Sequence, residues 1–254
     1  MTSLTHALST LASHPRAVAA ATVAREACTE LRWHEALRRR IPEACAESRI
    51  RGARASAMLD GARLPLERVR EMVLGLGQGG DLDPVERVVM GAVAATSESE
   101  RLRAVVRRAP YQGLARLHVA ATAGLLPADQ VGRPRAEGEA CAEVVDLGAA
   151  PGVDVVAERL AALADIVAAV SQGLPALAVA AIVHAEVMTV RPFVAGNGLV
   201  ARAMERAIVA AFGLDPTGVA VPETGHERAG LAGYLGALTA YGSGGLDGVL
   251  IWLE

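Results

Sequence analysis

A Gly-Asn-Gly turn is the part of the chain whose residue types and spacing are best suited to chemistry. Gly196, Asn197 and Gly198 lie between two hydrophobic stretches, which predicts that successive backbone N–H groups converge at the start of a helix. Glycines let a phosphate approach the backbone closely, and Asn tolerates left-handed dihedral angles while offering an amide donor. Arg202 follows one helical turn later on the same face. The pattern predicts an anion site, although an ordinary helix–turn–helix connection uses the same residues.

The elements around this turn are predicted to be helices. Hydrophobic residues make up 52% of the chain but aromatic residues only 3%, and Ala, Leu, Arg and Glu dominate, which favours helix over sheet. Asp83-Pro84-Val85-Glu86 predicts a capped helix start. The apolar stripe over residues 160–170 predicts a second helix that ends at Gly173, and the run Leu174–Val190 predicts a buried one.

The segment between Leu125 and Val153 differs from the rest because it is rich in Pro and Gly. It contains a short apolar run at Val144, Val145 and Leu147, which predicts a loop or a small β-hairpin. The sequence contains no internal repeat and no low-complexity linker. We therefore expect a mainly α fold, with an N-terminal helical extension over residues 1–75 packed as one unit with a core domain over residues 76–254.

Composition and charge exclude several classes of function. The net charge is −3, so no positive field attracts nucleic acid or a membrane surface, and no segment predicts a bilayer span. All 25 basic residues are Arg, which excludes mechanisms that need a Lys. Three scattered cysteines predict neither disulfides nor a CxxC metal site. We expect a cytoplasmic protein.

Histidines offer few further candidates for chemistry. His118 and His184 lie among apolar residues, outside any array with metal-ligand spacing, so a structural role is predicted for both. Glu223 and His226 follow the turn and its helix closely enough to be alternative bases, although the sequence does not show where they point.

The segment Arg191–Arg202 resembles the motif of the Fic family, usually written HPFx(D/E)GNGRxxR. Pro192, Phe193, the Gly-Asn-Gly turn and Arg202 are in register with it. Residues 180–186 resemble the helix before that motif, and residues 126–135 and 144–146 resemble the family's flap. The resemblance extends over about residues 30–254. It implies a Fic-like helical bundle with one short β-hairpin flap.

A second match lies in the N-terminal third of the chain. Ser56 through Gly61 resembles the family's inhibitory-helix motif, (S/T)xxxE(G/N), with Asp60 in place of Glu. The resemblance implies a regulatory role for Ser56, Asp60 and Gly61. In the family the inhibitory Glu pairs with the second motif arginine, so Asp60 is expected to lie close to Arg202.

The family usually transfers AMP from ATP to a hydroxyl group of a target protein. Its motif His is the general base, and its acidic residue holds Mg²⁺. Here Arg191, whose guanidinium cannot accept a proton at neutral pH, takes the position of the His, and Ala195 has no side-chain oxygen for a metal. The first motif Arg is Leu199. The phosphate-binding roles carry over to Gly196, Asn197, Gly198 and Arg202, and Arg191 adds a second cation as the fifth residue of the set.

Three functions remain open. The first is a pseudoenzyme that binds ATP, another nucleotide or a different phosphate-bearing ligand and acts through interaction with a protein partner. It is impaired in AMP transfer, and its motif does not hold Mg²⁺. The second is an active nucleotidyl or phosphate-group transferase of altered chemistry, with Glu223 or His226 as base. The third is a structural helical interaction protein with an empty site.

Overall fold

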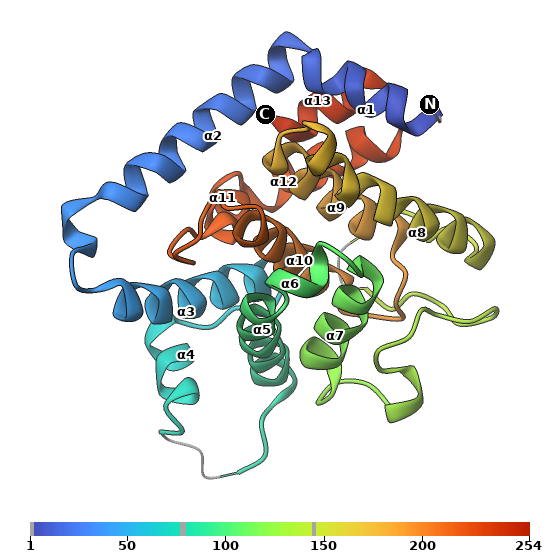
Figure 1. Ribbon diagram of the computed structural model, residues 1–254. Helices are drawn as coiled ribbons and strands as arrows, with labels where there is room; N and C mark the ends of the chain where they lie inside the picture. Colours follow the sequence, from blue (N-terminus) through green and yellow to red (C-terminus); the bar gives the residue numbers. More distant parts are fainter. Residues whose placement is uncertain (1–2, 77–79, 144–145) are drawn as a thin grey trace.

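The protein folds into a bundle of helices (Figure 1). The structure is a computed structural model that describes residues 3–76, 80–143 and 146–254. The first half contains α1 (Ser3–Ser13), α2 (Pro15–Trp33), η1 (Glu35–Leu37), α3 (Ile41–Leu59), α4 (Leu66–Val73), α5 (Pro84–Arg101), α6 (Arg103–Val106) and α7 (Pro110–Thr122). The second half contains η2 (Ala128–Gln130), α8 (Val153–Ala168), η3 (Ala169–Gln172), α9 (Ala176–Val190), α10 (Asn197–Ala211), α11 (Pro222–Arg228), α12 (Gly230–Gly242) and α13 (Leu246–Leu253).

The helix boundaries predicted from capping residues are confirmed. Asp83 accepts a hydrogen bond from the backbone N–H of Glu86, and the Glu86 side chain accepts one from the Asp83 N–H, which completes a capping box before α5. Gly173 ends the α8–η3 stretch with a left-handed φ of 102°. The apolar run after it forms α9, most of which is buried.

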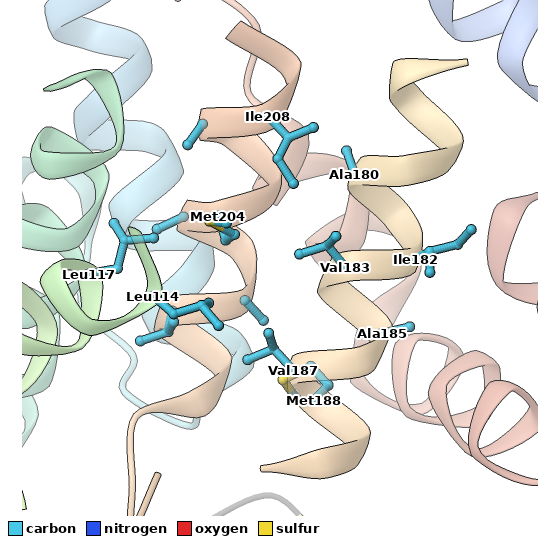
Figure 2. Close-up of a cluster of buried hydrophobic side chains, with 14 of the residues drawn as sticks. Leu114, Leu117, Ala180, Ile182, Val183, Ala185, Val187, Met188, Met204 and Ile208 are labelled. Atoms are coloured by element: carbon cyan, nitrogen blue, oxygen red, sulfur yellow. The ribbon is translucent and has the colours of Figure 1, made fainter. Parts of the chain in front are cut away.

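The pair α9 and α10 forms the centre of the bundle (Figures 1 and 2). A helix that is apolar on all sides is stable only when other elements surround it, and α9 has this composition. Val183 of α9 points towards Met204 of α10 in Figure 2, and Val187 points towards α10 further along the helix; all three side chains are at most 1% exposed. Truncating such a side chain to Ala typically costs about 2–5 kcal/mol, so this pairing fixes the turn that joins the two helices.

The remaining helices surround this pair. α5 and α7 pack on α10, α8 packs on α9, and α12 and α13 cover another side of α9. The long helix α2 contacts α9 and α13 (Figure 1). From the predicted N-terminal extension, α3 packs on α5, α10 and α11. The domain boundary near residue 75 stays a prediction.

Three charged side chains of α10 lie inside the protein, each with partners. Arg202 is fully buried, Arg206 is 4% exposed and Glu205 is 6% exposed. A buried charge is costly unless it is paired and hydrogen-bonded. These residues therefore indicate where α10 requires fixed neighbours from other segments.

The β-hairpin expected within residues 125–153 is not confirmed. The described part of this segment contains a single 3₁₀ turn, η2, and no strand, while Val144 and Val145 lie outside the described residues. The described part of this segment forms backbone hydrogen bonds to the turn between α9 and α10, through Arg135 and Ala142. Among the described helices, none combines the length and apolar character that crossing a bilayer requires.

Candidate functional site

The turn between α9 and α10 is closed by the side chain of Asn197. Its Oδ1 accepts a hydrogen bond from the Phe193 N–H at 2.9 Å, and its Nδ2 donates one to the Phe193 carbonyl at 2.9 Å. Gly196 precedes α10 with φ 79°, a left-handed conformation that favours glycine. The sequence therefore places glycine and asparagine where the backbone must reverse direction.

Residues 126–143, called the flap from this point on, run beside this turn. The Arg135 N–H donates to the Pro192 carbonyl at 2.8 Å, and the Ala142 N–H donates to the Val194 carbonyl at 2.6 Å. The Arg135 side chain also donates to the carbonyl of Arg191 at 2.9 Å. These bonds hold the flap backbone against the turn.

A carboxylate from the flap occupies the N-terminus of α10. Oε1 of Glu143 accepts hydrogen bonds from the Asn197 backbone N–H at 2.8 Å and from its Nδ2 at 2.5 Å. Burial and the nearby charge of Asp60 raise the pKa of Glu143 above its ordinary value, although the bonds from Asn197 oppose this shift. Sequence reasoning missed Glu143, because a single Glu in a loop gives no signal of the distant helix that it caps.

A second carboxylate lies against the same turn. Oδ1 of Asp60 accepts a hydrogen bond from Nη2 of Arg202 at 2.6 Å, so the expected proximity of these two residues is confirmed. A side chain at Gly198 would collide with the Asp60 carboxylate, which shows how closely that group approaches the backbone. The pair is buried, since the Arg202 side chain is 0% exposed and that of Asp60 is 12% exposed.

The residues around Asp60 position the buried arginine. Ser56 accepts from Nε of Arg202 through its hydroxyl at 2.8 Å and from Nη2 through its carbonyl at 3.0 Å. Nη1 of Arg202 donates to the Tyr234 hydroxyl at 3.2 Å. Gly61, with φ 86°, directs the chain away after α3. Ser56 and Asp60 therefore both contact Arg202, while the regulatory role of these residues stays a prediction.

Two backbone donors at the start of α10 remain available. Glu143 satisfies the amide of Asn197, and the helical bond to Gly196 satisfies the amide of Val200. The amides of Gly198 and Leu199 have no hydrogen-bond partner among the described residues. A phosphate at this helix end would find these donors, the positive end of the helix dipole and the Arg202 guanidinium.

The Arg191 side chain bonds to a neighbouring loop and not to the Gly196–Gly198 turn. It adopts a left-handed φ of 45°, and its guanidinium donates to the carbonyls of Gly148 and Ala149, both at 2.8 Å. It therefore connects the end of α9 to the loop before α8. Its predicted phosphate role stays a prediction, and would require the release of these carbonyls.

The other candidate residues have partners outside the turn. His118 stacks on Phe193 with ring centroids 3.9 Å apart, and burial lowers its pKa to about 4, so it is neutral. Glu223 pairs with Arg206 at 3.1 Å, and His226 with Glu205 at 2.8 Å. Neither of the proposed alternative bases contacts the Gly196–Gly198 turn.

No side-chain oxygen stands at the motif position that would hold Mg²⁺. Ala195 occupies it, and its carbonyl lies 3.1 Å from Nε2 of His118. The donor set at the turn fits phosphate oxygens, since it consists of N–H groups and a guanidinium. Ala195 offers no side-chain ligand to a hard cation, which prefers oxygen, and the two carboxylates beside the turn already accept hydrogen bonds from Asn197 and Arg202.

Comparison with known proteins identifies the fold. No family model and no curated protein matches the sequence. Among solved structures, a Fic family protein from Desulfovibrio desulfuricans superposes with a TM-score of 0.73 at 22% identity, covering 94% of this chain and 71% of that one. Fic-1 from C. elegans superposes with a TM-score of 0.66 at 19% identity, covering 94% of this chain and 67% of that one. The chain therefore has the Fic fold.

Proposed function

We propose that this protein is a Fic-like pseudoenzyme that binds a nucleotide or another phosphate-bearing ligand at the Gly196–Gly198 turn and is impaired in AMP transfer to protein hydroxyls. One observation carries the proposal: carboxylates from two remote segments, Asp60 and Glu143, converge on this turn. Two anions gather where a helix N-terminus and a buried arginine attract negative charge. A phosphate group would take their place.

The chemistry of the turn supports binding over transfer. The side chain at the position of the family's base is Arg191, a guanidinium that donates to two carbonyls and has no acceptor atom for a proton. Losing a positioned general base typically costs about 10²–10⁴-fold in rate. The missing acidic residue at Ala195 and the missing arginine at Leu199 reduce the rate further. A target protein, as in the family, would then be bound or regulated.

One observation favours a second candidate, an active transferase of altered chemistry. Glu143 is a buried carboxyl group with a raised pKa at the edge of the turn. A raised pKa makes a carboxylate a better proton acceptor, so Glu143, once displaced from Asn197, could deprotonate a hydroxyl of a target. This candidate replaces the bases first considered, Glu223 and His226.

A pair of glycine variants tests the binding site. Gly198→Ala places a methyl group where the Asp60 carboxylate, or a phosphate, must lie, whereas a Cβ at Gly236 on α12 meets nothing within 4 Å. Thermal shifts with ATP, ADP, AMP and phosphate, with and without Mg²⁺, should show stabilisation in the wild type and in Gly236→Ala but not in Gly198→Ala. Equal stabilisation of all three proteins would place the ligand elsewhere. No stabilisation of any would indicate an empty structural site.

Labelling with α-labelled ATP separates the two functional candidates. The pseudoenzyme should transfer no label to itself or to proteins of a cell extract. Transfer that is lost in Glu143→Gln would establish the altered transferase instead.

A further inference from the structure

A second polar cluster lies away from the phosphate turn. It contains His184 of α9, Glu205 of α10 and His226 of α11, and one ligand atom from each lies within 4.8 Å of the others. Oε2 of Glu205 is central, since it lies 2.6 Å from Nδ1 of His184 and 2.8 Å from Nε2 of His226. Two imidazole nitrogens thus point at one carboxylate oxygen inside a helical protein.

We propose that His184, Glu205 and His226 bind one divalent transition-metal ion, with Zn²⁺ as the best-suited class. Two imidazoles and one carboxylate are the protein ligands of an established type of zinc site that keeps a fourth position open. The set offers a single carboxylate as a hard oxygen ligand, which is too few for Mg²⁺ or Ca²⁺. The cluster and the phosphate site share one neighbour, Tyr234, whose hydroxyl contacts both His184 and Arg202, but none of the three proposed metal ligands is a proposed phosphate-binding residue.

The residues behind the cluster fit such a site. A ligating histidine usually forms a hydrogen bond through its other ring nitrogen, which fixes its orientation. Nε2 of His184 lies 2.7 Å from the Tyr234 hydroxyl, which can accept that bond. The His226 ring lies parallel to Trp252, at 6° between planes, which orients the second ligand.

The cluster also has an entry path. Glu205, His226 and Tyr234 line a pocket of about 440 Å³ whose other walls include α2 and Trp252. The side chain of His226 is 22% exposed, whereas that of His184 is fully buried. A metal ion would therefore enter from the pocket and keep its open coordination position on that side.

Small movements convert the present hydrogen-bonded arrangement into a metal site. Zinc–nitrogen bonds of about 2.1 Å allow two ligand atoms to be at most roughly 4.2 Å apart, and about 3.4 Å in a tetrahedral site. The ligand atoms here lie within 4.8 Å of one another, so the largest separation must shrink by up to roughly 1.4 Å, and the Glu205 oxygen must draw back from its 2.6 Å and 2.8 Å contacts by roughly 0.7 Å. His226 has the most room to move, because its side chain is 22% exposed whereas those of His184 and Glu205 are 0% and 8% exposed.

Calorimetric titration of the metal-free protein with ZnCl₂ tests the site. The proposal predicts saturation at one ion per chain. Losing an outer hydrogen-bond partner typically weakens metal binding about 10–100-fold, so Tyr234→Phe should have this effect and His226→Ala at least as large a one. His6→Ala, which removes an exposed histidine of α1, is the matched control and should leave the affinity unchanged. The melting temperature of each variant without metal verifies folding.

A measurement on the unaltered protein makes the test independent of variants. Zinc X-ray absorption should show imidazole scattering from two histidines, and Co²⁺ should give the visible bands of a four-coordinate site. The proposal is overturned if no saturable binding is found, if His226→Ala binds as tightly as His6→Ala, or if the bound zinc shows no imidazole ligands.

Discussion

Asp60→Ala should weaken the fold and tighten anion binding at the same time. The substitution leaves the fully buried Arg202 guanidinium without its carboxylate. Breaking a buried ion pair typically costs about 3–5 kcal/mol. The lower end applies, because Ser56 and Tyr234 continue to accept from Arg202 and the repulsion between Asp60 and Glu143 disappears. For a chain of this size about 3 kcal/mol corresponds to a fall in Tm of roughly 6–12 °C.

The same variant should bind anions better, because a competing carboxylate is gone and Arg202 is free to pair with a ligand. We expect the affinity for sulfate or AMP to rise at least about tenfold, which equals about 1.4 kcal/mol. Differential scanning calorimetry measures Tm, and isothermal titration measures affinity. Glu254→Gln, which breaks the exposed pair with Arg16, is the control and should change neither quantity. An unchanged affinity in Asp60→Ala would show that Asp60 does not compete for the anion site.

Three other predictions address the same turn. Glu143→Gln keeps the side-chain oxygen that accepts from the helix amide but removes its charge, so sulfate affinity should rise roughly 3–10-fold in titration calorimetry, as expected for one charge-assisted bond; no change would contradict the competition. Glu143 faces Asp60 and Arg202, and burial together with the charge of Asp60 raises its pKa in the folded state. It therefore gains a proton at a higher pH than an exposed Glu does. Sulfate stays ionised, so its affinity should increase from about pH 7 to about pH 5 in the wild type, and this dependence should be absent in Glu143→Gln. The double variant Arg191→His/Ala195→Glu should gain weak, Mg²⁺-dependent labelling from α-labelled ATP, with Leu199 retained because it is 2% exposed in the core; labelling that persists without Mg²⁺ would contradict the assigned role of position 195.

Local sequence signals were sufficient for much of the helical framework. The start of α5 depends on Asp83 and Glu86, which are three residues apart, and the end of the α8–η3 stretch depends on Gly173. Such caps act through the nearest backbone groups, so the sequence alone reveals them. The hairpin is not confirmed among the described residues. There Arg135 hydrogen-bonds to Pro192 of the motif, a long-range contact that periodicity cannot reveal.

In the candidate site too, local sequence predicts some features, and long-range contacts determine the others. Glycine and asparagine at positions 196–198 follow from the geometry of a tight turn before a helix. The contact between Asp60 and Arg202 spans 142 residues and was expected only from the resemblance to Fic proteins. Glu143 and the orientation of Arg191 depend on where the loops before α8 lie. Tertiary packing decides those positions, so no short sequence window contains them.

A crystal structure of the protein soaked with ATP tests the central claim most directly. The account predicts a phosphate oxygen about 3 Å from the amide nitrogens of Gly198 and Leu199 and from the Arg202 guanidinium, with the Glu143 carboxylate displaced from Asn197. Glu143 still bound to the Asn197 amide at saturating ATP, with the nucleotide elsewhere or absent, would contradict it.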